Sequence, residues 1–345
     1  MTVERLKKLA VYTGIFAALS ITACLYRAGT KRIVIVDAAT TQEMVTIADE
    51  DAMEAVPMET EGLLDGEERD ALIIPLPQGV GSDGILLEER YMSHALALTI
   101  VTKDTGFYET HPCRTDLEMI RQAARVVQPQ SVRLVFTLGE FYAAETELTE
   151  DGRILIRFRH PSELYQHVIV LDADAGASTQ GQEAIEQLAV LVKEHLDREF
   201  GGTVRCYLTT QGETEATEER KRMLLTESEA DLFIQLNARA DMPAQGIACY
   251  YNDRFYIRGF GNVALADLLE QHVTQTTGAD ALGLFPETGD GILNQTQIPS
   301  AAVCIGDITQ PAQLTQLQDT AWQDKIAHGI TEGVREALTV MEEGQ

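Results

Sequence analysis

The chain has little positive charge. Its 345 residues include 27 Lys and Arg against 54 Asp and Glu, which leaves a formal net charge of −27. A nucleic-acid-binding surface needs clustered basic residues that displace counterions from phosphates, and the sequence contains no such stripe. We therefore expect no nucleic-acid partner, and a soluble surface that repels other copies of itself.

Cysteine is also scarce, and its spacing excludes two kinds of site. The five cysteines are Cys24, Cys113, Cys206, Cys249 and Cys304, and no two of them form a CxxC pair. A zinc knuckle or a thioredoxin-type redox pair depends on that spacing. The last three lie in apolar, strand-like segments, where a free thiol behaves as a small hydrophobic side chain.

Long apolar runs are limited to the N-terminus. Residues 9–26 contain no charge and are flanked by basic residues on both sides, and these 18 residues are just enough to cross a hydrocarbon core of ~30 Å. The sequence predicts a membrane anchor in residues 1–32, with a single pass and the bulk of the chain outside the cytoplasm. Two alternatives remain open: a lipoprotein acylated at Cys24, within the cleavage-box-like segment ITAC, and a cleaved secretion signal.

Two further segments separate the anchor from the C-terminal half. Residues 33–71 are strongly acidic, with Arg69 as the single basic residue after position 40, and such a run predicts an extended linker or stalk. An acidic arm that binds a partner is the alternative. Residues 72–165 alternate in the manner of short strands, which predicts a small β-rich α+β domain. We expect one helix in it, over residues 116–127, and two neighbouring antiparallel strands, over residues 132–136 and 154–158.

Residues 166–345 alternate between strand and helix patterns. This alternation predicts an α/β domain with a largely parallel twisted sheet and helices on both faces. The expected strands are residues 168–171, 204–208, 232–236, 247–251 and 301–305, and the expected helices are residues 182–200, 215–229, 263–276 and 322–341.

Five segments of this last domain carry recognisable motifs. They are VIVLDADAG at 168–176, ADLFIQLNAR at 230–239, GIACYY at 246–251, PSAAVCIG at 299–306 and TAWQDKIAHGI at 320–330. In this order they resemble motifs of the zinc-dependent N-acetylmuramoyl-L-alanine amidases, which cut the bond between glycan and stem peptide in bacterial cell walls. The resemblance implies an amidase-like fold and peptidoglycan as the class of ligand.

The same resemblance implies that the reactive positions have been replaced. It puts zinc ligands at Ala175, Glu183 and Asn237, and the catalytic glutamate at Cys304. Active members hold zinc with two imidazoles and a carboxylate and leave one position for water. Ala175 has no donor atom, Asn237 offers only a neutral amide oxygen, and Cys304 lacks the reach and pKa of a glutamate. Only Glu183 is retained, so we expect no cofactor and no catalytic residue.

Three functions follow as hypotheses. The first is a membrane-anchored, extracytoplasmic pseudo-amidase that binds peptidoglycan fragments or a cell-envelope protein. The second is a divergent amidase with altered metal ligands, and the third is a structural envelope protein. The same residues allow three alternatives to a structural role. Asp172, Asp174 and Glu183 could form a cation site, although a surface carboxylate cluster is the commoner explanation. Cys304 could be a nucleophile and the aromatic residues between positions 250 and 260 could line a groove, but we expect a buried, inert cysteine and aromatic packing in the core and loops.

Overall fold

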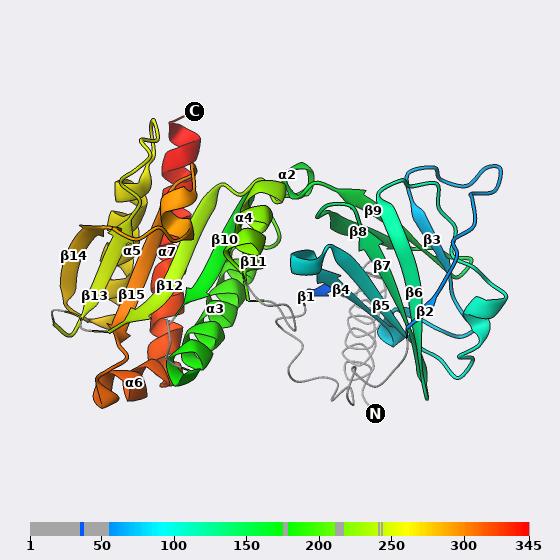
Figure 1. The fold of residues 1–345 in the computed structure, drawn as a ribbon, viewed down its shortest axis with the longest axis horizontal. Helices are drawn as coiled ribbons and strands as arrows, with labels where there is room; N and C mark the ends of the chain where they lie inside the picture. Colours follow the sequence, from blue (N-terminus) through cyan, green and yellow to red (C-terminus); the bar gives the residue numbers. More distant parts are fainter. Residues whose placement is uncertain are drawn as a thin grey trace, which may run out of the picture.

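The chain forms two lobes (Figure 1). The computed structural model describes residues 35–37, 55–174, 179–210, 217–240, 242 and 244–344. The β-rich lobe lies on the right of Figure 1 and the α/β lobe on the left, with the short helix α2 (Pro161–Leu164) at their junction. The expected anchor, including Cys24, lies outside the described residues. Among the helices that are described, none combines the length and apolar character needed to cross a membrane.

The β-rich lobe consists of two sheets. The larger has the strand order β1-β4-β5-β7-β6-β2 and is antiparallel except for the pair β1 and β4. The smaller has the order β3-β9-β8 and is antiparallel. The strands are β1 (Ile35–Asp37), β2 (Val56–Pro57), β3 (Leu72–Pro75), β4 (Ile85–Arg90), β5 (Ala95–Val101), β6 (Ile120–Gln128), β7 (Ser131–Leu138), β8 (Ala143–Leu148) and β9 (Arg153–Arg159).

The two sheets pack face to face around one apolar core. Leu98 and Phe136 of the larger sheet meet Leu72 and Ile156 of the smaller sheet, as expected for a β-sandwich. The described residues from 55 to 160 contain short 3-10 turns but no α-helix, so the expected α+β domain is instead all-β.

Two expectations for this lobe are wrong. Residues 116–127 are not a helix, because β6 pairs with β7 along its length, with Ala124 opposite Val135. Of the apolar residues at helical spacing on this strand, Ile120, Ala123 and Ala124 are half-buried and Val127 is exposed. The expected strand pair 132–136 and 154–158 is also absent, since β7 and β9 belong to opposite sheets and meet through their side chains.

The end of the predicted stalk is part of this lobe. Strand β2 pairs with β6, and the Glu67 carboxylate lies 2.7 Å from Arg114 and 3.2 Å from Arg153. The hydrogen bond from Arg114 lowers the pKa of Glu67, although burial opposes the shift. Residues 55–71, which composition assigned to the linker, are therefore folded onto the sandwich through ion pairs.

The α/β lobe contains a mixed sheet of order β11-β10-β12-β15-β13-β14. The first four strands are parallel, whereas β13 is antiparallel to β15 and β14 is parallel to β13. The strands are β10 (His167–Asp174), β11 (Val204–Leu208), β12 (Leu232–Arg239), β13 (Ile247–Tyr251), β14 (Ala281–Pro286) and β15 (Ser300–Asp307). The helices are α3 (Thr179–Phe200), α4 (Glu218–Glu227), α5 (Asn262–Thr277), α6 (Pro311–Leu317) and α7 (Thr320–Glu343). The expected strand–helix alternation is present, and the sheet is largely parallel as expected, with β13 and β15 as its one antiparallel pair among the described strands.

Successive side chains of each strand point to opposite sides, so the sheet has two faces with different neighbours. Leu236 and Val303 face the core shared with α3, α5 and α7. Phe233 and Ala302 face the opposite side, where they pack against Leu224 of α4. This second face is the one that continues toward the polar carboxyl ends of β10, β12 and β15.

Residues of both lobes form the apolar core on this second face of the sheet. Tyr91 and Phe141 of the sandwich lie against Tyr207 of β11, and the three rings contact one another edge to face at 5.0–5.7 Å between centroids. The hydroxyl oxygen of Tyr91 accepts the N–H of Leu208 at 2.9 Å. At the same border Glu89 pairs with Arg205 at 2.9 Å. The sandwich thus covers the edge strand β11 with buried, directional contacts.

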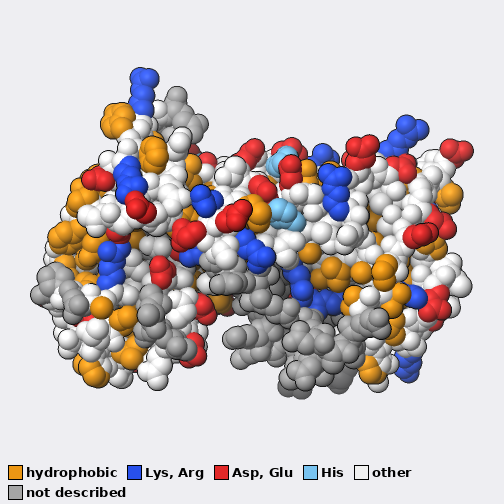
Figure 2. Space-filling view, in the orientation of Figure 1, with side chains coloured by type: hydrophobic (Ala, Val, Ile, Leu, Met, Phe, Trp, Pro, Cys, Tyr) orange, Lys and Arg blue, Asp and Glu red, His pale blue; other side chains and the backbone are white. Residues whose placement is uncertain are grey.

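Charge is distributed over both lobes. On the face drawn in Figure 2, Lys and Arg side chains are interspersed with Asp and Glu, and the described residues form no continuous basic stripe there. The described part of this face therefore offers no electrostatic track for a polyanion.

Candidate functional site

The carboxyl ends of three adjacent parallel strands meet at one place. Asp174 of β10 is the register partner of Asn237 of β12, and Asn237 is the register partner of Cys304 of β15. Leu236 and Val303 face the helices, so Asn237 and Cys304 face the opposite side together. The structure therefore brings together two of the positions that the sequence motifs had marked.

The other two marked positions are placed differently. Ala175 directly follows Asp174, but residues 175–178 lie outside the described part of the chain. Glu183 lies in the second turn of α3 with an exposed side chain. Helix α3 packs on the face of the sheet opposite to Asn237. Nothing in the described structure joins Glu183 to the strand ends, and its ligand role stays a prediction.

Asn237 is the polar group at the centre of this arrangement. Its side chain is only 4% exposed. Within the described residues its Oδ1 atom has no hydrogen-bond partner. A buried acceptor without a partner costs about 1–3 kcal/mol of stability. Because most buried polar groups are satisfied, such an atom marks a position that structural stability alone does not explain.

Cys304 is a fully buried thiol. Its Sγ lies 2.9 Å from the Sδ of Met242, and burial raises the pKa of the thiol. No histidine is placed to act as its base: His195 pairs with Asp324 and His272 with Glu336, all on helices of the other face. The Cys304 nucleophile therefore lacks the activating partner that it would need.

Asp172 is held by protein groups. Its carboxylate is completely buried and accepts hydrogen bonds from Gln235 at 2.8 Å, from Lys221 at 2.8 Å and from the hydroxyl of Thr209. Burial of Lys221 acts to lower its pKa, but the nearby carboxylates, with Asp172 foremost, together raise the pKa above its ordinary value. Because three protein groups donate to its carboxylate, Asp172 has a structural role. The alternative cation site of Asp172, Asp174 and Glu183 does not form among the described residues.

A second ion pair lies near the strand ends, between Arg239 and Glu287, and the Tyr250 ring lies beside it. The sequence did not predict this ion pair. The Arg239 guanidinium lies 3.7 Å from the centroid of the Tyr250 ring and forms an ion pair with Glu287. Burial alone would raise the pKa of Glu287, but the hydrogen bond from Arg239 and the N–H groups of residues 288 and 289 hold it below its ordinary value. The signal available in the sequence was an arginine at the end of a buried strand.

The aromatic residues that could have lined a groove between positions 250 and 260 lie in different places. Tyr250 lies beside Arg239, near the strand ends. The chain then leaves β13 toward the amino end of β15, because the two strands are antiparallel. Tyr256, on that loop, is 93% exposed and lies away from Cys304. These aromatic residues therefore do not line one groove.

The described residues at the strand ends do not form a zinc site. Among the described residues no group of three or more His, Cys, Asp or Glu side chains is arranged to hold a metal. The aligned positions offer a neutral amide at Asn237 and a protonated, buried thiol at Cys304, while alanine at position 175 has no donor atom. We derive no catalytic step through a metal from this set.

Comparison with known proteins matches the α/β lobe to one family. Residues 170–336 match the model of the N-acetylmuramoyl-L-alanine amidases, a span that runs from β10 into α7 and contains Asn237 and Cys304. No curated protein matches the chain.

Solved structures similar to the chain include three such amidases. The N-acetylmuramoyl-L-alanine amidase from Clostridium difficile 630 is 18% identical over 50% of this chain and 97% of that chain, with a TM-score of 0.45. AmiC2 of Nostoc punctiforme is 22% identical over 50% and 98%, with a TM-score of 0.42. The CwlD amidase from Clostridioides difficile, solved in complex with the GerS lipoprotein, is 17% identical over 50% and 99%, with a TM-score of 0.43.

Proposed function

Because its C-terminal half, residues 170–336, belongs to the N-acetylmuramoyl-L-alanine amidase family, we propose that this protein recognises peptidoglycan without hydrolysing it. Its α/β lobe binds wall fragments or a protein of the cell envelope at the carboxyl ends of β10, β12 and β15. The β-sandwich packs against that lobe through Tyr91 and Phe141 and presents a second surface for binding.

One observation carries the proposal. Asn237 and Cys304 are adjacent, buried and on one face, at positions where the family resemblance implies a ligand histidine and the catalytic glutamate. The amide cannot replace imidazole in activating a metal-bound water, and the buried thiol has neither a base nor a lowered pKa. Hydrolysis would therefore need a different set of groups from the one that is present.

Attachment to the cell membrane through residues 1–32 is part of the proposal. The uncharged run of residues 9–26 supports a single-pass anchor with the two lobes outside the cytoplasm. Membrane fractionation and protease accessibility of intact cells test this directly. If Cys24→Ala abolishes the lipid-modified, membrane-bound form, the protein is a lipoprotein acylated at Cys24 and not a single-pass membrane protein.

The binding test separates recognition from catalysis. Muropeptides and intact peptidoglycan are titrated against the variant lacking residues 1–32, and the products are examined by mass spectrometry. We expect binding that persists at high salt, since a protein of net charge −27 gains no attraction from anionic polymers, and no release of stem peptides. Release of stem peptides by the unaltered protein would favour the divergent amidase, and absence of any wall binding would favour a protein partner.

A further inference from the structure

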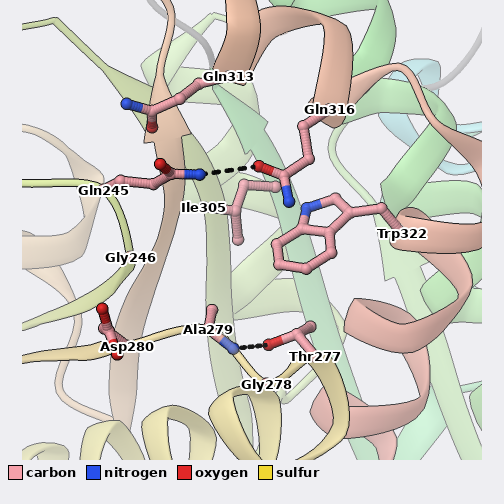
Figure 3. Close-up of a pocket in the computed structure, with 10 residues that line it drawn as sticks. All are labelled: Gln245, Gly246, Thr277, Gly278, Ala279, Asp280, Ile305, Gln313, Gln316 and Trp322. Carbon is pink, nitrogen blue, oxygen red and sulfur yellow. Dashed lines mark hydrogen bonds between the residues drawn. The ribbon is translucent and has the colours of Figure 1, made fainter.

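A second hollow in the α/β lobe lies away from the candidate site. A pocket of about 350 Å³ opens between the end of α5, the helix α6 and the start of α7 (Figure 3). Its floor includes Ile305, which faces the α-helices, whereas the preceding Cys304 faces the other side of the sheet. The pocket is therefore separate from the strand-end site.

Three glutamine amides line this pocket. The Oε1 of Gln313 accepts the backbone N–H of Asp307 at 2.9 Å, which turns its NH₂ group away from that bond and fixes the orientation of the amide. Gln245 donates to Oε1 of Gln316 at 3.4 Å (Figure 3). Hydrogen-bonding capacity remains on the Gln245 oxygen and on the NH₂ groups of Gln313 and Gln316. The pocket thus presents uncharged donors and acceptors together.

The indole of Trp322 forms another wall, on a rigid corner of the fold. Figure 3 shows it between the Gln316 amide and the turn that follows α5. The Asp319 carboxylate caps α7 by accepting a hydrogen bond from the backbone N–H of Trp322 at 2.8 Å. The buried Gln323 amide donates to the carbonyls of Leu317 at 2.9 Å and Ala184 at 3.0 Å, which ties this corner to α3. A site supported by such contacts holds its geometry before a ligand arrives.

We propose that this pocket binds one neutral sugar unit. A pyranose ring has an apolar C–H face that packs on an indole and hydroxyls that both donate and accept, which matches the Trp322 ring and the glutamine amides. The volume lies at the small end of small-molecule sites. Among the described residues of the lining Asp280 is the one that carries a charge, and it is an anion, so the pocket disfavours phosphorylated or acidic sugars.

Tryptophan fluorescence reports on this pocket specifically, because Trp322 is the only tryptophan of the chain. The variant lacking residues 1–32 and the full chain in detergent are titrated with N-acetylglucosamine, glucose and glucuronate under excitation selective for indole. We expect a saturable change with the neutral sugars and weaker binding of glucuronate. An oligosaccharide of N-acetylglucosamine in the same series shows whether the unit is bound free or at a chain end.

Gln316→Ala is the test variant and Gln318→Ala its matched control, since Gln318 ends the same helix with an exposed side chain outside the pocket. Loss of one hydrogen bond should weaken neutral-sugar affinity about 3- to 10-fold in Gln316→Ala and leave Gln318→Ala unchanged. Saturation-transfer NMR on the sugar provides a readout independent of the indole. The proposal is overturned by absence of saturable binding in both measurements, by equal affinity of the two variants, or by glucuronate binding as tightly as glucose.

Discussion

Asn237 and Cys304 are register partners on the adjacent parallel strands β12 and β15, and both side chains are buried on the same face of the sheet. An active amidase site would need a metal ligand and a proton-transferring group at this point. Here the first is an amide whose Oδ1 has no partner among the described residues, and the second is a thiol in contact with Met242. Both side chains are therefore buried at the strand ends, one with an unpaired acceptor and the other in contact with a thioether.

Restoring a zinc site should need several changes at once. Ala175→His, Asn237→His and Cys304→Glu rebuild the set that the family resemblance implies around Glu183. Groups that act as a unit are strongly non-additive, so we expect each single variant to lack activity and only the triple variant to bind zinc. Elemental analysis and release of stem peptides measure the two properties. Turnover in any single variant would contradict this expectation.

Lys221 should be essential for stability because it neutralises a buried carboxylate. Lys221→Met leaves Asp172 charged and without its ion pair in the interior, and breaking a buried pair in this way costs about 3–5 kcal/mol. Urea unfolding measures the loss. The control is Arg222→Met on the exposed side of the same helix, and adding Asp172→Asn to Lys221→Met should recover part of the stability.

Tyr91 should contribute to the attachment of the two lobes through its hydroxyl. Tyr91→Phe leaves the buried N–H of Leu208 without its acceptor, and an unsatisfied buried donor costs about 1–3 kcal/mol. We expect a lower urea midpoint for unfolding of the unit, measured by circular dichroism. Tyr256→Phe, which changes a ring that is 93% exposed, is the matched control and should have no effect.

Acid should weaken the Arg239–Glu287 contact. The pKa of Glu287 is lower in the folded protein than its ordinary value, so the ion pair stabilises the fold fully above the unfolded-state pKa of about 4.3 and is lost as pH falls through the folded-state pKa. Glu287→Gln should lower stability at neutral pH and flatten the acid limb of a plot of urea midpoint against pH. An acid limb as steep as that of the unaltered protein would show that other carboxylates account for it.

The sequence predicted the α/β lobe well where elements are long and buried. The strands at 204–208 and 247–251 and the helix at 322–341 are present because their apolar spacing matches one periodicity over the whole element. Strand β14 was missed: its ALGLFP segment is short, contains Gly283 and Pro286, and lies at an edge of the sheet. Its residues are half-buried or exposed without alternation, so no period-two pattern of apolar residues marks the strand.

The β-sandwich shows where such reasoning fails. Residues 116–127 have apolar residues at helical spacing, yet β6 forms because its backbone pairs with β7 on one side and β2 on the other. Short-range patterns do not encode that pairing. At the candidate site, the positions of Asn237 and Cys304 followed from their motifs. The contacts of Arg239 with Tyr250 and Glu287 join side chains of different segments, and no motif or periodicity in the sequence encodes them.

The metal content of the purified protein tests the central claim most directly. The variant lacking residues 1–32 is purified without chelator, dialysed, and examined by elemental analysis and by thermal unfolding with and without EDTA. A tightly held ion stabilises the native state by about 4 kcal/mol when it is present at 1,000 times its dissociation constant, so its removal would lower the unfolding temperature. We predict far less than one zinc per chain and the same unfolding temperature in EDTA. Near-stoichiometric zinc that survives dialysis, with a fall in unfolding temperature in EDTA, would contradict the account.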